Sequence, residues 1–185
     1  MSGEGRRSSG DALEKAIENA NANTNANAQE KDNEIPGPPS LRPFGLVLHH
    51  DGRWTHEGQP FTNRRLRELF DRSVRYLAEE DAYVVQVGRF RGLVEIEEAG
   101  FFVRSLDVEQ GSVALSDGSS EPLEVGSLHT SPRDGALLCS VKRALRPAGV
   151  PARFSHSAQA DFMNAMDESG EWIRLGGRRQ AVPEL

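Results

Sequence analysis

The stretch DGRWTHEGQPFTNRRLRELFDRSVRYL, residues 51–77, contains a tight turn, a short strand and an amphipathic helix in succession. Asp51-Gly52 is a strong turn signal, and it joins an apolar run at 44–48 to a second strand at 53–55. Thr62 or Asn63 then provides a helix N-cap. Apolar residues recur after it at helical spacing: Leu66, Leu69, Phe70, Val74 and Leu77. This order predicts one sheet-and-helix unit.

The sequence that follows predicts mostly strands. After Asp81 the apolar period changes to two, at Tyr83, Val85 and Val87, and residues 88–92 turn the chain. Further strands are expected around 94–96, 101–108, 112–115, 123–128 and 136–141. Short connections favour antiparallel pairing, because parallel pairs need long crossovers.

A second, shorter helix is expected near residue 157. Ser155 or Ser157 can cap it, and its inward residues would be Ala158, Phe162, Ala165 and Met166. Trp172, Ile173 and Leu175 give a last strand, and Gly176-Gly177 starts a polar tail. The predicted fold class is therefore α+β, with two duplicated antiparallel sheet-plus-helix units.

The chain is expected to divide into three parts, a leader that differs in composition and two units that follow from the order of the predicted strands and helices. Residues 1–40 hold an alternating Asn/Ala tract and end in a Pro-rich segment, so they are expected to form a disordered leader. Residues 41–108 form the first unit and 109–185 the second. The whole chain has 185 residues and a formal net charge of −6. Nucleic-acid binding depends on excess cations, so the charge argues against such a partner.

Several classes of protein are disfavoured by absent features. The apolar runs are too short for a signal peptide or a membrane span, so the expected location is the cytoplasm. The single cysteine, Cys139, excludes an internal disulfide and a multi-thiolate zinc site, and its apolar neighbours predict a buried residue. No phosphate-binding loop or dinucleotide fingerprint is present.

Candidate ligand contacts gather around two predicted hairpins. Trp54 and His56 combine an aromatic ring with a titratable side chain, although core packing is the commoner role for Trp54. Arg89 and Arg91 can hold a phosphate, or form ion pairs with the nearby acids Glu97 and Glu98.

A metal site is the least supported alternative. His49, His56 and Glu57 suit a metal-assisted hydrolase, but adjacent histidines on a strand are expected to face opposite sides, which would separate His49 from His50.

The segments DGRWTHEGQPF and LVEIEEAGFFV resemble the bacterial family known as domain of unknown function 1285. The family's Asp-Gly, Trp, His, Gly, Pro series is met by Asp51, Gly52, Trp54, His56, Gly58 and Pro60. Its acidic pair followed by Ala, a turn residue and Phe is met by Glu97, Glu98, Ala99, Gly100 and Phe101.

The resemblance implies a duplicated α+β core whose second half is loosely like pleckstrin-homology folds. It also implies a groove between the halves for a nucleotide-like molecule, and a role in signalling. It brings no established activity and leaves any cofactor unknown. We therefore expect a non-enzymatic small-ligand or signal-sensing module. The alternative is a protein-interaction adaptor, motivated by exposed strands and by the leader.

Overall fold

The structure is a computed structural model that describes residues 41–88 and 90–185. The predicted leader, 1–40, lies outside the described residues. The described chain forms two compact units, residues 41–77 with 81–97 and residues 78–80 with 98–185. The division thus falls at Glu97–Glu98, before the boundary after Val108 that the order of predicted elements suggested. The reason is that strand β7 (Phe101–Asp107) pairs with strands of the second unit.

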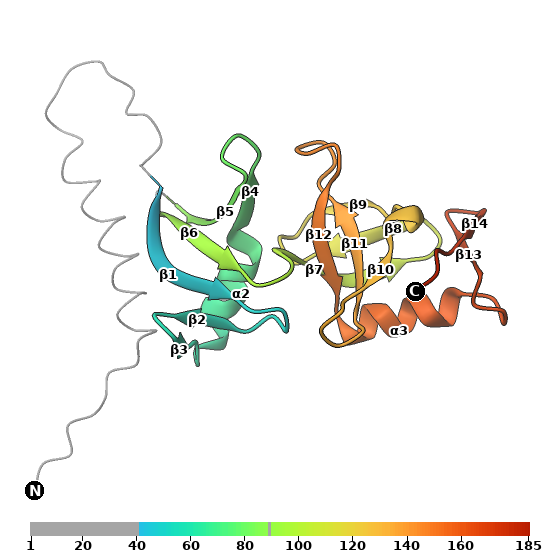
Figure 1. Cartoon of the computed structure of the whole chain (residues 1–185), viewed down its shortest axis with the longest axis horizontal. Coiled ribbons are helices and arrows are strands. Elements are labelled where there is room, and N and C mark those ends of the chain that lie inside the picture. The colour runs from blue at the N-terminus through green and yellow to red at the C-terminus, as the bar shows by residue number, and fades with distance from the viewer. Residues whose placement is uncertain (1–40, 89) are drawn as a thin grey trace, which may run out of the picture. The chain divides into compact units, whose positions relative to one another are not determined.

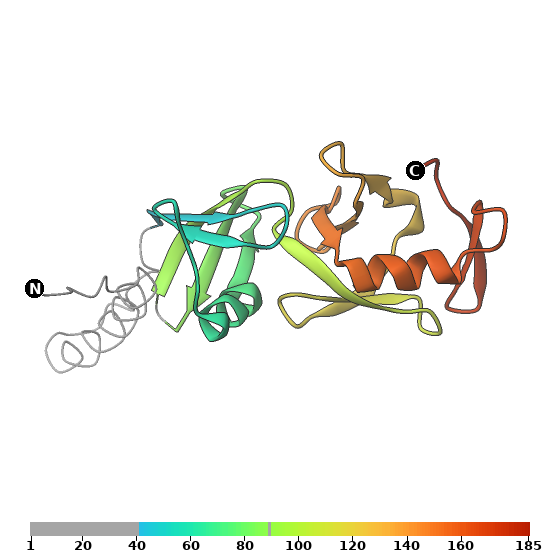
Figure 2. The ribbon, with the colours of Figure 1, turned by 90° about the horizontal axis from the view of Figure 1, so that it is seen from below.

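The first unit is a six-stranded sheet with one helix (Figure 1). The strand order is β3-β2-β1-β6-β5-β4. Its elements are β1 (Arg42–Leu48), β2 (Trp54–His56), β3 (Gln59–Pro60), α2 (Arg64–Ser73), β4 (Val74–Leu77), β5 (Ala82–Val87) and β6 (Phe90–Ile96). Figure 2 shows α2 against one face of this sheet.

The second unit is also built on a six-stranded sheet, in the order β10-β11-β12-β7-β8-β9. After β7 come β8 (Ser112–Leu115), β9 (Ser120–Pro122), the 3₁₀ helix η1 (Val125–Ser127), β10 (His129–Thr130), β11 (Leu137–Val141) and β12 (Val150–Phe154). Helix α3 (His156–Ala165) follows and packs on β7 and β12. A separate hairpin, β13 (Trp172–Leu175) with β14 (Arg178–Ala181), completes the unit.

The two sheets have the same topology, which agrees with the predicted duplication. When the six strands of each unit are numbered in chain order, both sheets read third-second-first-sixth-fifth-fourth. Each unit therefore consists of two three-stranded meanders whose first and sixth strands meet at the centre. The helices differ in place, since α2 joins the two meanders and α3 follows the second one.

The prediction of purely antiparallel sheets was wrong. β1 pairs with β6 in parallel, and β12 pairs with β7 in parallel. The short connections do join antiparallel neighbours, as expected. The parallel pairs arise because the first and last strands of a unit, far apart in sequence, run in the same direction where the two meanders meet.

Helix α2 is shorter than its apolar pattern predicted. Asn63 caps it, accepting hydrogen bonds from the backbone N–H groups of Arg65 and Leu66, but the helix ends at Ser73. Beyond Ser73, burial alternates along β4, where Val74 and Tyr76 are buried and Arg75 is exposed. Leu69, expected on the apolar face, is 42% exposed. The pairing of β4 with β5 overrides the helical pattern of the last turn.

Local differences affect the other strands as well. β6 begins at Phe90, so the expected turn at 88–92 is shorter, and the predicted strand at 123–128 is replaced by η1. β12 and β14 were not predicted. Gly176 and Gly177, with φ of 55° and 73°, form the two-residue turn between β13 and β14 instead of starting a tail.

The units have separate apolar cores. In the first, Trp54, Phe61 and Phe70 pack against one another. In the second, Phe162 of α3 contacts Phe154 edge-on, and Cys139 is fully buried, as predicted. Both described helices are ten residues long, and neither has the length and apolar content of a bilayer-spanning segment.

Candidate functional site

Trp54 belongs to the core of the first unit. Its side chain is 1% exposed, and its indole Nε1–H donates a hydrogen bond to Asp71 Oδ1 at 2.8 Å. The ring meets Phe70 edge-on, with centroids 5.4 Å apart. A ring enclosed in this way offers no face to a ligand, so Trp54 is removed from the candidate ligand contacts.

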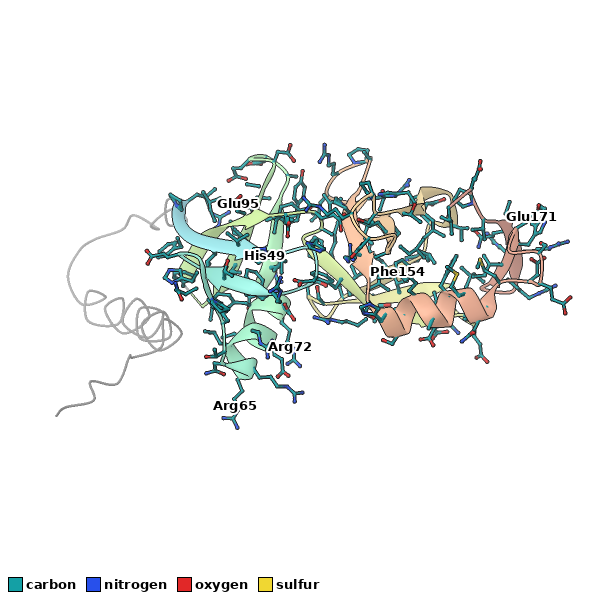
Figure 3. The ribbon with its side chains drawn as sticks, turned by 60° about the horizontal axis from the view of Figure 1, so that its bottom comes forward. His49, Arg65, Arg72, Glu95, Phe154 and Glu171 are labelled. Carbon is teal, nitrogen blue, oxygen red and sulfur yellow. The ribbon has the colours of Figure 1, made fainter. Side chains whose placement is uncertain are left out.

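The sheet register separates the remaining candidates of the first unit. Paired residues point to the same face of a sheet, and strand neighbours point to opposite faces. Pairing of β6 with β1, and of β1 with β2, places Thr55 on the face of Glu95 and Arg91. Trp54 and His56 therefore point to the opposite face. In Figure 3, Glu95 lies across the sheet from α2.

Arg91 and Glu97 also lie far apart along one strand. Arg91 is near the start of β6, and Glu97 follows its last residue. Six residues of extended chain span about 20 Å. Arg91 is half-buried, and its Nε atom is buried without a hydrogen-bond partner. Arg89 lies outside the described residues.

Glu97 forms a compact polar cluster with His49 and His50. Its Oε2 atom accepts a hydrogen bond from the His50 backbone N–H at 2.9 Å, and lies 2.9 Å from His50 Nδ1 and 3.3 Å from His49 Nδ1. His49 Nε2 is 3.1 Å from Thr55 Oγ1. The expectation that the two histidines face opposite sides was wrong, because both lie after the end of β1, where strand alternation no longer applies.

Glu98, the neighbour of Glu97 in sequence, belongs to the second unit. Its carboxylate accepts hydrogen bonds from Ser131 Oγ and from Arg153, each at 2.5 Å. Arg153 is 7% exposed and also pairs with Asp134. Among the five sequence candidates that the structure describes, it does not bring all together in one place, and Glu98 forms a buried ion pair with Arg153.

No metal-binding group of three or more His, Cys, Asp or Glu side chains occurs among the residues that the structure describes. Burial raises the pKa of the Cys139 thiol to about 12, and the nearby Glu121 charge adds to that effect. The thiolate form is then scarce at neutral pH, so this cysteine is not an activated nucleophile.

The second unit contains another partly buried charged cluster around Lys142. Its Nζ is 2.9 Å from Asp117 Oδ2 and 3.4 Å from Glu121 Oε1, and it donates to Ser119 Oγ at 2.5 Å. Burial pushes the pKa of Asp117 upward, but hydrogen bonds from Lys142 and Ser119 outweigh burial and hold that pKa below its ordinary value.

This lowered pKa predicts a loss of stability in acid. The Asp117 contribution is complete above the ordinary aspartate pKa and disappears as pH falls through the lower folded-state value. Asp117→Asn should cost about 1.5–3 kcal/mol at pH 7, typical of a hydrogen bond to a charged group. Urea unfolding from pH 7 to 3 should show the gap between wild type and variant closing below about pH 4. A gap that stays constant over this range would contradict the assignment.

A pocket that the sequence analysis did not identify lies beside the β13–β14 hairpin. Its volume is about 330 Å³, and its lining includes Met166, Asp167, Trp172, Arg174 and Arg179. The Arg179 guanidinium lies 4.4 Å from the centre of the Trp172 ring. The Nη2 atom of Arg179 is 3.5 Å from Asp167 Oδ2.

Strand pairing brings two arginines together at this pocket. Arg174 pairs with Arg179, next to the pair that closes the two-residue turn. In such a hairpin this is a non-hydrogen-bonded pair, in which side chains approach most closely. A hydrogen bond from Ser169 and, to a smaller extent, the Arg179 charge hold the pKa of Asp167 below its ordinary value, so its carboxylate is ionised. Arg174 is exposed and has no ion pair or hydrogen bond within the described chain.

The sequence did hold a signal for this pocket. In WIRLGGRRQ, residues 172–180, strand alternation puts Trp172 and Arg174 on one face, and a turn at Gly176-Gly177 returns Arg179 to the same face. Two consecutive glycines are also typical of the start of a polar tail, as predicted here, and that interpretation leaves Arg174 and Arg179 unpaired.

The fold defines a two-unit α+β protein. No known family profile matches the sequence, and no curated protein matches it. A solved structure of a DUF1285 family protein from Silicibacter pomeroyi DSS-3 is similar, with a TM-score of 0.54 and 16% identity over 83% of this chain and 90% of that chain. A DUF1285 family protein from Shewanella baltica OS155 aligns with a TM-score of 0.44 and 16% identity, over 68% of this chain and 95% of that chain.

The first of these similarities extends over both units, because it covers more of the chain than either unit holds. This chain therefore has the fold of a DUF1285 family protein. The resemblance drawn from the sequence is confirmed at the level of the fold.

Proposed function

We propose that this protein is a non-enzymatic module that binds a small, nucleotide-like anion, and that the pocket around Trp172 and Arg174 is its site. The observation that carries the proposal is an unpaired arginine, Arg174, held opposite Arg179 beside the half-buried ring of Trp172. Like charges that face each other across a hairpin destabilise it. An anion between the two guanidinium groups removes this repulsion.

The chemistry of the pocket matches the two parts of a nucleotide. Guanidinium groups bind phosphate with paired, charge-assisted hydrogen bonds. The indole of Trp172 gives a planar surface for stacking a base or another ring. The pocket volume, about 330 Å³, lies within the range of small-molecule sites.

We also propose that ligand binding serves signalling in the cytoplasm, and that the second unit resembles pleckstrin-homology folds. In that unit a helix, α3, follows six strands. Of the residues that the sequence singled out, Arg91 keeps a place as a rival anion contact, since its Nε is buried without a partner.

The test is an NMR titration of the full chain with AMP, observing the two indole N–H signals. Trp172 lines the pocket and should shift, whereas the signal of the buried Trp54 should stay in place. Arg174→Gln should weaken AMP binding about tenfold or more, because it removes a charge-assisted hydrogen bond.

Arg178→Gln is the matched control, since Arg178 is exposed on the same hairpin but points to the opposite face from Arg179. An equal loss of affinity in both variants would indicate a general charge effect and overturn the site. Arg91→Gln tests the rival position. If it abolished binding and Arg174→Gln did not, the ligand would lie on the first unit. A titration in which neither indole signal moves would reject the proposed function.

A further inference from the structure

A second cavity adjoins the arginine pocket and shares Met166 and Trp172 with it. Its volume is about 590 Å³. Apolar residues of α3, its C-cap, β13 and the C-terminal segment line most of it: Met163, Met166, Trp172, Val182, Pro183 and Leu185. We call this cavity the methionine groove. Met163 is 44% exposed and Leu185 is 40% exposed, so the groove leaves apolar surface in contact with water.

Charge is distributed unequally between the two cavities. The arginine pocket holds Arg174 and Arg179 against the single carboxylate of Asp167, whereas the methionine groove is bordered by Glu171 and Glu184 and contains no cation. An anionic group is therefore attracted to the pocket and repelled from the groove. The part of a ligand that enters the groove has to be uncharged and apolar.

We propose that the ligand is an amphipathic anion, with its phosphate between Arg174 and Arg179 and an apolar arm in the methionine groove. This inference rests on the proposed function, because it takes the arginine pocket as the anion site. Trp172 borders both cavities, so its ring contacts the ligand where the head joins the arm. Methionine side chains are unbranched and polarisable, which suits a groove that packs around a flexible chain.

The experiment compares phosphate monoesters that share one head group. Monobutyl and monooctyl phosphate are titrated below micellar concentration into the full chain, with ¹³C-methyl methionine and ¹⁵N-indole labels. Each fully buried methylene strengthens binding about fourfold. Because Met163 and Leu185 of the groove remain partly exposed, burial of the arm is incomplete, and we expect the octyl ester to bind about tenfold or more tightly than the butyl ester. The methyl signals of Met163 and Met166 should move only with the longer ester.

A groove variant, a control variant and a ligand without phosphate test the contribution of the apolar arm separately from that of the phosphate head. Met163→Gln places an amide in the groove and should remove most of the gain from chain length, while leaving the weaker butyl ester unaffected. Leu145→Gln is the matched control, since Leu145 is also a large exposed apolar residue of the second unit and does not line the groove. Octanol, which has the arm without the head, should bind far more weakly than the octyl ester.

The outcomes distinguish failure of the inference from failure of the proposed function. If AMP and both esters bind through Arg174 with equal affinity for the two chain lengths, the amphipathic ligand is rejected and the anion site stands. If octanol binds as tightly as the octyl ester, the groove acts without the arginines, which also overturns the inference. If no phosphate compound moves the Trp172 signal, both fail together.

Discussion

Replacing Arg153 with methionine should lower the free energy of unfolding of the second unit by about 3–5 kcal/mol. Arg153 is 7% exposed, one residue before the end of β12, and its guanidinium bridges Glu98 and Asp134. Methionine fills most of the volume of the arginine side chain, but it leaves the Glu98 carboxylate without its cation. The Glu98 side chain is 11% exposed. A buried charge that loses its partner costs more than the pair contributes. Urea unfolding followed by far-UV circular dichroism measures the loss.

A double variant separates lost charge pairing from lost packing. Arg153→Met with Glu98→Leu removes both charges and should recover a large part of the stability, as replacement of a whole buried pair often does. Arg174→Met is the control for substituting an exposed arginine in the same unit, and it should change stability by about 0.5 kcal/mol or less. An Arg153→Met loss as small as that of the control would mean that water solvates Glu98 and that the ion pair is not structural.

The Arg153 ion pair also explains why part of the fold was not predictable from sequence. β12 reads VPARF, in which a proline and an arginine interrupt the apolar pattern of a buried strand. The arginine is tolerated there because Glu98, 55 positions earlier, neutralises it. A sequence pattern relates residues within about one helical turn or one hairpin, so it could not indicate that Glu98 pairs with Arg153. The parallel pairing of β1 with β6 is nonlocal in the same way.

Features with local causes were predicted well. The Asp51-Gly52 turn, the Asn63 cap and the Ser155 cap each depend on residues within a few positions, and all three are present. Ser155 Oγ accepts a hydrogen bond from the Ala158 backbone N–H, as a capping serine should. The same locality explains the error at the end of α2, where helical spacing and strand alternation both fit the sequence and only the pairing with β5 decides between them.

The candidate site was harder to predict than the fold, because it depends on which strand faces coincide. Trp54 and Arg91 are close to turns in the sequence, and proximity to turns suggested one cluster. The register puts them on opposite faces of one sheet. Trp172 and Arg179, in contrast, lie on the same face of their hairpin. They come together only because Gly176-Gly177 forms a two-residue turn. Side-chain chemistry was visible in the sequence in both cases, and strand pairing determined which groups meet.

Replacing Trp54 with alanine should destabilise the first unit by about 3–5 kcal/mol, the range for removing a large aromatic side chain from a core. Trp54 packs against Phe61 and Phe70, and its indole donates to Asp71, so alanine leaves a cavity and removes one hydrogen bond to the Asp71 carboxylate. If the alanine variant does not fold, the Trp54→Phe variant measures the contribution of Trp54 to stability. Phenylalanine retains most of the packing and should cost less, chiefly through the lost N–H donor.

Trp172→Ala is the matched control for Trp54→Ala. Trp172 is half-buried and its main described contact is the stacked Arg179 guanidinium, so alanine should cost about 1 kcal/mol. Only one of the two tryptophans should affect ligand binding: AMP affinity should be lost in Trp172→Ala and unchanged in Trp54→Phe. A Trp54→Phe variant that is stable but no longer binds AMP would return Trp54 to the ligand site, and would place the recognition surface in the first unit instead of the second.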